Sequence, residues 1–483
     1  MGRFQRVIKT DIRSSGVASL NSNRVSWSDE SKLMPVSPLD YRYGRDVAKE
    51  IWSREGRHAR LLEVERALIW AHSQMGRVSP EEYDAIAEIS DPGIVTADRV
   101  EELESETKHD IMALTKAMAE AAGDAGWCIH LGATSNDIVD SAVALQIKDS
   151  ISIQNESLRD LILTMCEIAE REAGTVMLGR THGQAAVPIT FGLKVAVWVD
   201  EFKRHLDRLD EISPRCTTGK FLGAVGTGAA QGDRALELQD LVLGNLGLGI
   251  PVATTQVVGR DRYIEWVSWM ANVATSVEKI LQEVRNLQRT EIAEVSEAFD
   301  SEKQVGSSTM AHKKNPITAE NACGLARVAR SMIIPTYENA LLWHERDLAN
   351  SSSERFTLSH AMILVDDIVS KCNKVLSGMV VDKKRMRANI DSQNGLIMAE
   401  KVMLELVDRG MPRDEAHEEL RRASMKAVEN GRNLESECKS SERIMEILEE
   451  SELSGFFDPE SHIGASKDIV ANAISIARER CSE

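Results

Sequence analysis

Aromatic residues, cysteines and long apolar runs are all scarce in this sequence. Phe, Trp and Tyr together make up 4% of the 483 residues, whereas Ala, Leu, Glu, Arg and Met are plentiful, a composition that favours helix. No apolar run reaches the roughly 18 residues that a membrane span requires. We therefore expect a mainly helical protein that binds no membrane.

The cysteines are few, scattered and odd in number. None of the seven stands in C-x-x-C spacing, so neither a disulfide framework nor a zinc site is indicated. This usage is typical of a reducing compartment, and we expect a cytoplasmic location. Residues 1–37 are rich in Ser, Asn and Arg and poor in acids. They are interpreted either as a disordered leader or as an organellar transit peptide.

Basic residues are fewer than acidic ones, 58 against 76. The formal net charge is −18 at pH 7, and no segment is broadly basic, which argues against a nucleic-acid-binding surface. If the substrate is an anion, the cations that bind it must be few and locally placed.

Proline and glycine are missing from long stretches, and these gaps locate the helices. No proline occurs in residues 93–187 or 252–315, and the 46 residues from Arg260 to Val305 contain neither glycine nor proline. If wholly helical, that span would be about 65–70 Å long. A second long helix is expected over about residues 138–173. Apolar residues recur in both segments at alternating spacings of three and four, as in a helix bundle.

We find no convincing strand alternation and no internal repeat, so the predicted fold class is all-α. The chain is divided into a leader (1–37), an N-terminal helical domain (38–130), a central bundle of very long helices that carries the catalytic loop (131–375), and a C-terminal helical domain (376–483). A Gly-Met-Pro turn at residues 410–412 is expected between two helices of the last domain.

The most informative segment runs from Gly306 to Pro316 and reads GSSTMAHKKNP. Proline at the first position of a helix, after an asparagine cap, is a strong start signal. A helix N-terminus carries partial positive charge and free N–H donors, so it favours anions. Together with Lys313 and Lys314, it could hold a carboxylate or stabilise a serine alkoxide, which otherwise is hard to form.

Two further polar clusters interrupt the apolar pattern. Residues 130–137 (HLGATSND) precede the helix expected at 138–173, and residues 179–184 (GRTHGQ) follow it. That helix should be roughly 50 Å long, so the two clusters are expected at its opposite ends. If both belong to one site, the site must be formed between chains of a homo-oligomer.

These three segments, in this order, resemble the fumarase/aspartase superfamily, whose members eliminate fumarate from succinyl compounds. The loop resembles the family's G-S-S-x-M-P-x-K-x-N-P segment, with Ala311 where the family has proline. The resemblance implies a general acid–base role for His182, oriented by Glu320. It also implies a homotetramer with a core of twenty helices.

Within the superfamily, the chain resembles the adenylosuccinate lyases from about residue 38 to about residue 430. The resemblance rests on residues 40–44 (DYRYG), 107–110 (TKHD), 255–256 (TQ), 343–347 (WHERD), 351–355 (SSSER) and 395–401 (GLIMAEK). Lys108 stands where arginine is common, so the charge is kept and the bidentate geometry is lost.

The resemblance implies roles for individual residues. The forked cations Arg346 and Arg355, with the Ser351 hydroxyl, are suited to a phosphate. Nucleotide or phosphate contacts are implied for Arg42, Tyr43, His109, Ser351 and Arg355, and contacts to the succinyl carboxylates for Thr134, Ser135, Lys313 and Asn315. The remaining predicted substrate-binding residues are Lys108, Asp110, Thr181, Gln256 and Arg346.

The implied reaction is an anti β-elimination. Ser307, as alkoxide, removes the proton next to a carboxylate, Lys313 and Asn315 stabilise the dianion, and His182 protonates the leaving nitrogen. Adenylosuccinate would give fumarate and AMP, and the succinyl-carboxamide ribotide (SAICAR) would give AICAR. No metal or organic cofactor is called for. Whether His109 shares the acid role with His182 is left open.

Three alternatives remain. Argininosuccinate lyase has the Lys-Lys-Asn run found at 313–315, but its substrate lacks the phosphate that Arg346 and Arg355 would bind. A carboxymuconate cycloisomerase would catalyse a different class of reaction. An inactive helical scaffold would be expected to have lost chemical residues, yet Ser307, His182 and Glu320 are all present.

Overall fold

The computed structural model describes residues 36–299, 310 and 312–483. The chain divides into two units, at residues 42 and 43. Among its described residues, the first contains one short helix, α1 (Pro38–Tyr41), which begins with a capping box between Ser37 and Asp40. The second unit contains all the other elements and is described below.

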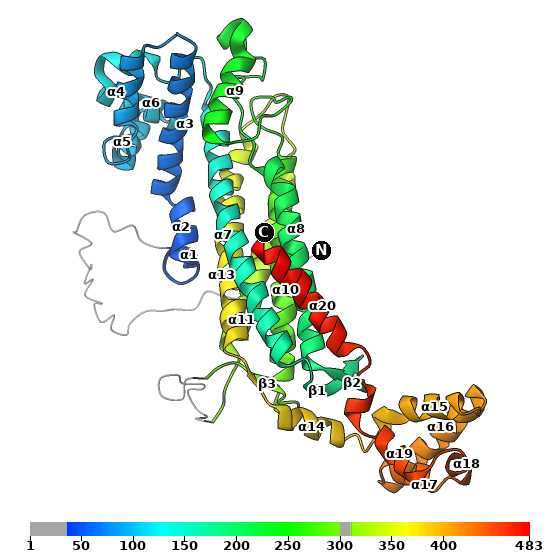
Figure 1. The fold of residues 1–483 in the computed structure, drawn as a ribbon. Helices are drawn as coiled ribbons and strands as arrows, with labels where there is room; N and C mark the ends of the chain where they lie inside the picture. The colour runs from blue at the N-terminus through cyan, green and yellow to red at the C-terminus, as the bar shows by residue number, and fades with distance from the viewer. Residues whose placement is uncertain (1–35, 300–309, 311) are drawn as a thin grey trace, which may run out of the picture. The chain divides into compact units, whose positions relative to one another are not determined.

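A bundle of long helices forms the centre of the second unit (Figure 1). Its members are α7 (Ser135–Arg171), α8 (Phe191–Cys216), α10 (Asp261–Leu287), α11 (Ile317–Ser331), α13 (Ala349–Ser377) and α20 (Ser466–Ser482). Leu158, Leu161 and Met165 of α7 are fully buried, as the spacing of apolar residues predicts. α20 returns from the end of the chain to pack on α7 and α8. The all-α prediction is confirmed.

Helix α10 is shorter than the glycine-free and proline-free span around it. It ends at Leu287, and the backbone carbonyl of Arg289 then accepts from the N–H groups of Ile292 and Ala293, at 2.9 and 2.7 Å. Ala293 has a φ of 52°, a conformation that ends a helix. The side chain of Glu294, which follows, is buried in a salt bridge with Arg180. That salt bridge holds the chain soon after it has left the helix, where no glycine or proline marks an end.

The expectation of no strands is wrong in two places. β1 (Val176–Thr181) and β2 (Gln184–Thr190) form an antiparallel hairpin. Its two-residue turn, His182-Gly183, has φ values of 55° and 74°, and two positive φ angles are what the type I′ hairpin turn requires. A smaller pairing joins β3 (Val295–Ser296) to β4 (Val380–Val381).

The helices before the bundle share a core with its first turns. They are α2 (Asp46–Trp52), α3 (Arg54–Gln74), α4 (Pro80–Ile89), α5 (Ala97–Thr107) and α6 (Asp110–Ala122). The buried cluster of Leu62, Leu68 and Leu114 continues into Ile138 of α7 and into Leu238 of α9 (Ala235–Leu246). A buried apolar contact of this kind fixes the start of α7 against the preceding helices.

Five of the helices after the bundle share a core of their own, and the first of these helices packs against β1 instead. The helices after the bundle are α14 (Lys383–Asp391), α15 (Ala399–Asp408), α16 (Arg413–Asn430), α17 (Leu434–Lys439), α18 (Glu442–Met445) and α19 (Glu450–Phe456), and α12 (Ile333–Glu338) lies between α11 and α13. Val402, Leu420 and Leu434 belong to a cluster separate from the bundle. The turn predicted at residues 410–412 separates α15 from α16. The domain boundaries near residues 130 and 376 stay predictions.

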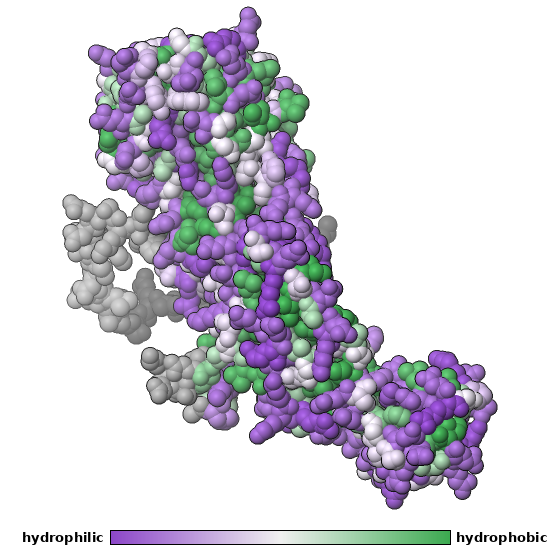
Figure 2. All heavy atoms as spheres, viewed as in Figure 1, coloured by the Kyte–Doolittle hydropathy of each residue, from purple (hydrophilic) through white to green (hydrophobic). Residues whose placement is uncertain are grey.

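Polar side chains cover most of the face shown in Figure 2, with smaller apolar areas between them. Within the described residues, no helix combines the length and apolarity needed to cross a bilayer. All seven cysteines are free thiols, and six are buried.

A buried histidine in the bundle makes stability depend on pH. His205 of α8 is 1% exposed, and its Nε2 lies 2.8 Å from the hydroxyl of Ser276, which donates to Glu201. Burial, with help from Arg208, lowers the pKa of His205 to about 4. In the unfolded chain the imidazole titrates near 6.5. Protonation therefore favours the unfolded state as pH falls from about 6.5 towards 4.

We expect this one group to remove up to about 3 kcal/mol of stability over that pH range. His205→Gln should flatten the corresponding part of the profile when urea unfolding is followed at pH 7.5, 6 and 5. The matched control is His417→Gln, because His417 is exposed and its replacement should leave the profile unchanged. An equal slope in the parent and in His205→Gln would contradict the assignment.

Candidate active site

The turn before α7 is held by its own capping residues. Thr134 is the N-cap, and its backbone N–H donates to Asp137 at 2.7 Å in a capping box. Ser135 is the first residue of the helix. Both side chains are half-buried. The polar residues predicted to contact a carboxylate therefore lie at a helix N-terminus, where a negative charge is favoured.

Asp137 is paired with a fully buried lysine. The ammonium of Lys220 contacts Asp137 and donates to the carbonyl of Gly223 at 3.1 Å, and the Gly223 N–H donates to Asp137 at 3.3 Å. Burial raises the pKa of Asp137, and Lys220 opposes that rise. The pair ties the Thr134 turn to residues 220–223, so each side chain satisfies the other's charge.

A second buried carboxylate, that of Glu65, binds His130, the first residue of the polar segment 130–137. The Nδ1 atom of His130 lies 2.6 Å from Glu65, which is fully buried on α3. Burial lowers the pKa of the imidazole, but the charge of Glu65 more than compensates, and the pKa is raised overall. His130 has a φ of 60°, so this turn is fixed by both its backbone and its ion pair.

Gln256 and Arg346 lie together near the same end of α7. The guanidinium of Arg346 donates to the Gln256 side-chain oxygen at 3.1 Å, and the Gln256 N–H donates to the Glu345 carbonyl at 3.3 Å. The Nε of Arg346 is buried without a hydrogen-bond partner among the described residues. Burial, together with the nearby charge of Arg260, lowers the pKa of Arg346. An anion placed beside Arg346 would give the Nε a hydrogen-bond partner and would raise the pKa of the guanidinium.

Asp110 brings two arginines from different helices together. Its carboxylate lies 3.4 Å from Arg57 of α3 and 3.4 Å from Arg355 of α13. His109 is the N-cap of α6, and its Nδ1 accepts from the Met112 N–H at 3.2 Å. This tautomer leaves Nε2 as the donor.

Arg57 was missed by the sequence analysis, because nothing in its spacing distinguishes it from a surface arginine. Burial lowers the pKa of its guanidinium, as does the charge of Arg355, so this pair of cations is only partly neutralised by Asp110. Lys108, next to this cluster, ends α5 with a φ of 54° and is exposed.

These contacts define the α7 N-terminal end of the site. The Asp140 side chain, on the second turn of α7, bonds Arg260, which also bonds Glu354 of α13. Ser351 lies on the first turn of α13 and is half-buried. The end comprises Lys108, His109, Asp110, Thr134, Ser135, Gln256, Arg346, Ser351 and Arg355.

The hairpin lies beyond the other end of α7. His182 and Thr181 are exposed at its turn. Just before them, Arg180 makes a bidentate salt bridge to the buried Glu294, at 2.7 and 2.9 Å. Asn389 donates to the same carboxylate at 2.8 Å. The base of the turn is therefore fixed, and the imidazole projects from a rigid two-stranded support.

The N-terminus of α11 lies near the hairpin, because both are tied to residues on either side of β3. Glu294 precedes β3 and holds Arg180. Glu297 follows β3, and its carboxylate accepts from the N–H groups of Thr318 and Ala319, at 3.3 and 2.6 Å. We call this region, with Thr181, His182, Lys313, Asn315 and Glu320, the hairpin end.

Two details at α11 differ from expectation. The helix begins at Ile317, with Pro316 as its N-cap rather than its first residue. The anion at its N–H groups is the protein's own Glu297, which is 8% exposed, so these donors are already satisfied. Lys313 is exposed.

Tyr43 lies beside the C-terminal half of α13 rather than with Arg355. The Lys371 ammonium sits over its ring at 5.1 Å and donates to Asn321, the residue after Glu320, at 2.7 Å. Lys371 is about 24 Å further along α13 than Arg355 at 1.5 Å per residue. Arg42 belongs to the first unit. Ser307 and Ala311 lie outside the described residues.

The α7 N-terminal end and the hairpin end are far apart in one chain. α7 has 37 residues and is therefore about 55 Å long. Among the described residues, no hydrogen bond or ion pair joins His182 to Glu320 or to any residue of the α7 N-terminal end. A site that uses both ends must take them from different chains.

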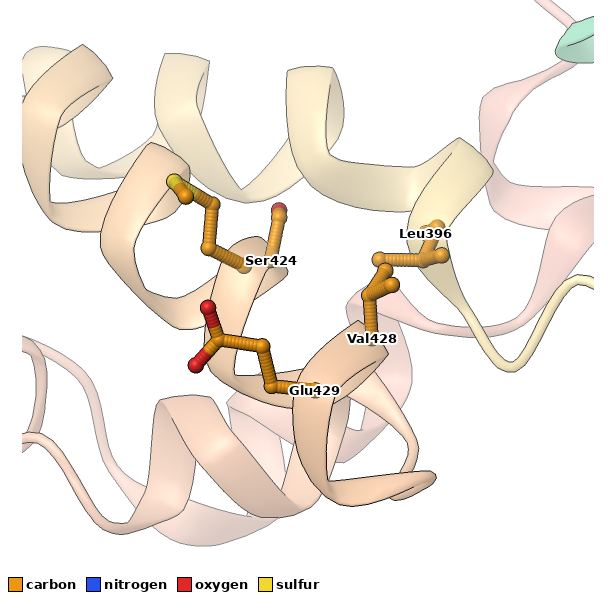
Figure 3. Close-up of a pocket in the computed structure, with 5 residues that line it drawn as sticks. Leu396, Ser424, Val428 and Glu429 are labelled. Carbon is orange, nitrogen blue, oxygen red and sulfur yellow. The ribbon is translucent and has the colours of Figure 1, made fainter.

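A hollow of about 420 Å³ lies elsewhere, on the helices after the bundle (Figure 3). It is lined by Leu396, Ser424, Met425, Val428 and Glu429. None of these belongs to the predicted site, and Glu429 is the one titratable group among them. The hollow therefore offers fewer groups for catalysis than the two ends of α7.

Two family models match the chain. The model described as "Lyase" matches residues 40–330, and the model described as "Adenylosuccinate lyase C-terminus" matches residues 395–473. The first covers the residues of both ends as far as Glu320 and stops before Arg346, Ser351 and Arg355. The second covers α15 to α19 and the first part of α20.

Curated relatives match over nearly the whole chain. A protein named adenylosuccinate lyase from Pyrococcus abyssi is 46% identical over 446 residues, which are 92% of this chain and 99% of the relative. Another of that name, from Methanothermobacter thermautotrophicus, is 44% identical over 91% of this chain and 98% of its own length.

Solved structures agree with the fold. Fumarate lyase from Mesorhizobium sp. BNC1 has a TM-score of 0.83 and 29% identity, covering 91% of this chain and all of that one. The 3-carboxy-cis,cis-muconate lactonizing enzyme from Pseudomonas putida has a TM-score of 0.84 and 30% identity, covering 92% and 99%. The chain thus shares its fold with solved structures that are named for different activities.

Proposed function

The chain belongs to the adenylosuccinate lyase family, and we propose that it eliminates fumarate from adenylosuccinate to give AMP. By the same chemistry it converts SAICAR to AICAR in purine nucleotide biosynthesis. The relationship to adenylosuccinate lyases along nearly the whole chain carries this assignment. The features described below supply the groups that the reaction needs.

The α7 N-terminal end is suited to a phosphorylated nucleotide. Arg346 has a buried Nε without a hydrogen-bond partner among the described residues, and Arg355 shares Asp110 with a second cation, Arg57. Forked guanidinium groups match the geometry of phosphate oxygens. We assign the phosphate to Arg346, Ser351 and Arg355, and the adjoining nucleoside to His109 and Gln256.

The succinyl group is assigned to residues from both ends. Thr134 and Ser135 offer hydroxyls at the start of α7, and Lys313 and Asn315 offer a charge and an amide from the segment before α11. Negative charge accumulates on one carboxylate as the adjacent proton leaves. Groups fixed around that carboxylate stabilise the dianion more than the substrate, which is the requirement for catalysis.

Proton transfer is assigned to Ser307 and His182. Ser307 removes the proton from the carbon, and His182 donates a proton to the leaving nitrogen of the purine, on the opposite face. The electron pair of the broken C–H bond forms the double bond of fumarate, and the C–N pair leaves with AMP. A rigid hairpin turn suits the acid, because proton transfer requires a short, fixed donor distance.

The complete site is proposed to form in a homotetramer. Exposed apolar side chains near the start of α13, including Trp343, Leu348 and Phe356, provide surface that another chain could bury. Antiparallel packing of bundles would bring the hairpin end of one chain to the α7 N-terminal end of another. We also propose a cytoplasmic location, since the buried thiols of the described residues require no oxidation.

The experiment that tests the activity measures fumarate release from purified protein given adenylosuccinate, with argininosuccinate and a carboxymuconate in parallel. We expect fumarate from adenylosuccinate alone. Release from argininosuccinate alone would contradict the role given to Arg346 and Arg355. Lactone formation from the carboxymuconate would point to the activity named for the relative from Pseudomonas putida. No turnover with any of the three would favour an inactive scaffold.

A further inference from the structure

Four charged side chains, two of them buried and two partly buried, form a network that includes Arg346, one of the groups assigned to the phosphate. Arg260 is 5% exposed and is the N-cap of α10. Its guanidinium bonds both oxygens of Asp140 on α7, at 2.8 and 3.0 Å, and both oxygens of Glu354 on α13, at 2.8 and 3.2 Å. One side chain therefore joins three helices of the bundle. Arg346 is the fourth charge.

Asp140, Arg260 and Glu354 are held by further hydrogen bonds. Asp140 also accepts from the Val258 N–H at 2.9 Å, and Arg260 donates to the Val258 carbonyl at 3.1 Å. Asn350 donates to Glu354 at 2.9 Å. Although burial disfavours the charged guanidinium, Asp140 raises the pKa of Arg260 well above its usual value. Buried groups with this many bonds are held in one arrangement.

Parts of the network lie close in sequence to residues assigned to substrate. Gln256 is two residues before Val258, Ser351 is three residues before Glu354, and Arg355 follows Glu354 directly on α13. The guanidinium of Arg346 donates to Gln256. Moving any one of the three bonded side chains would therefore shift the backbone that presents a phosphate contact.

The charges also balance. Asp140 and Glu354 contribute two negative charges, and Arg260 and Arg346 contribute two positive ones. The charge of Arg260 repels Arg346, while Asp140 and Glu354 attract it. Removal of one carboxylate would leave an unbalanced positive charge and would push the guanidinium of Arg346 away from Arg260.

We propose that Arg260, bridging Asp140 and Glu354, is a positioning residue that fixes Gln256, Arg346 and Ser351 for the substrate phosphate. This inference rests on the proposed function, because it takes those three residues as phosphate and nucleotide contacts. It adds a role for residues that do not touch the substrate. It also predicts that damage to the network weakens binding of the substrate phosphate more than binding of the succinyl group.

The test compares Glu354→Gln with the parent enzyme. A glutamine would turn an N–H group towards Arg260 and break half of the fork. We expect the KM for adenylosuccinate to rise about tenfold or more, with kcat within about threefold of the parent. The inhibition constant of inorganic phosphate should rise in parallel, while that of fumarate, which lacks phosphate, should stay within about twofold.

Two further variants keep the test decisive. Asn350→Ala removes one hydrogen bond to Glu354 without changing any charge, and it should raise the KM by a smaller factor than Glu354→Gln does. It serves as the test if Glu354→Gln fails to fold. Glu419→Gln is the matched control, because Glu419 is a carboxylate, 9% exposed, paired with Arg443 in the C-terminal helices. Its KM and phosphate inhibition should equal those of the parent.

An unchanged or lower KM in folded Glu354→Gln would overturn the inference. So would an equal rise in the inhibition constants of phosphate and fumarate, because that result would indicate a general loss of structure. If the parent enzyme itself releases no fumarate from adenylosuccinate, the proposed function fails first. The two failures are thereby distinguished.

Discussion

Mixing two inactive variants should restore activity. His109→Gln damages the α7 N-terminal end, and His182→Gln damages the hairpin end. Each variant alone, assayed below the KM, is expected to lose about 10²–10³-fold in rate, because His182 is the assigned proton donor and His109 is an assigned contact to the nucleoside. In a mixed oligomer, some sites would combine an intact α7 N-terminal end from one chain with an intact hairpin end from another.

The expected size of the effect follows from random assembly. With equal amounts of the two variants, half of the α7 N-terminal ends and half of the hairpin ends are intact. If each site takes the two ends from different chains, about a quarter of the sites are complete. Fumarate release should therefore recover to about a quarter of the parent rate after dissociation and reassociation together.

A matched pair tests the reasoning. His109 and Arg355 both adjoin Asp110 within one chain, so damage to either falls in the same end. A mixture of His109→Gln with Arg355→Ala, assayed below the KM, should recover nothing, because no chain then supplies an intact α7 N-terminal end. Recovery in that mixture, or its absence in the first, would show that the site is not divided in this way.

Ser307→Ala should abolish most of the turnover. The assigned base is an alkoxide, and no hydroxyl remains at that position once alanine replaces serine. We expect kcat to fall by about a thousandfold or more, while the KM changes little. The measurement is fumarate release under saturating adenylosuccinate, together with the mass of the oligomer by light scattering.

The neighbouring hydroxyl provides the control for this prediction. Ser308→Ala removes the same atom from the next residue and should keep turnover within about tenfold of the parent. If Ser308→Ala is the more damaging variant, the base has been assigned to the wrong serine. If both retain full turnover, proton abstraction must be carried out by another group.

The long helices could be predicted because their evidence is local. α7 lacks glycine and proline throughout, and its apolar residues keep one helical face, so its ends were placed within a few residues. The position of residues 130–137 and 179–184 at opposite ends of it then followed from the 1.5 Å rise per residue. That conclusion needed no knowledge of tertiary contacts.

The hairpin could not be predicted in the same way. Its strands are short, contain Gly179 and Pro188, and lack a clean alternation of apolar and polar residues. What holds the base of the turn is the contact between Arg180 and Glu294, two residues more than a hundred positions apart. The residue on the other side of this contact, Glu294, lies soon after the early end of α10. A long-range salt bridge of this kind is not revealed by local patterns.

The start of α11 shows a second limit. Asn-Pro correctly marked a helix start, to within one residue. The inference that its N–H groups await a substrate anion did not allow for Glu297, which approaches from another segment. Arg57 and Arg260 were missed for a related reason, since their importance lies in what the fold places beside them.

The length of α7 sets the distance between the two ends of the bundle. A four-residue insertion would lengthen it by about 6 Å and turn its far end by more than a full rotation. The hairpin would then no longer match the neighbouring helices α8, α10 and α13, whose lengths are set against it. Such an insertion could be tolerated only with matching changes in each. Sequence drift can therefore reshape the helices at either end of this protein far more freely than it can change the span between them.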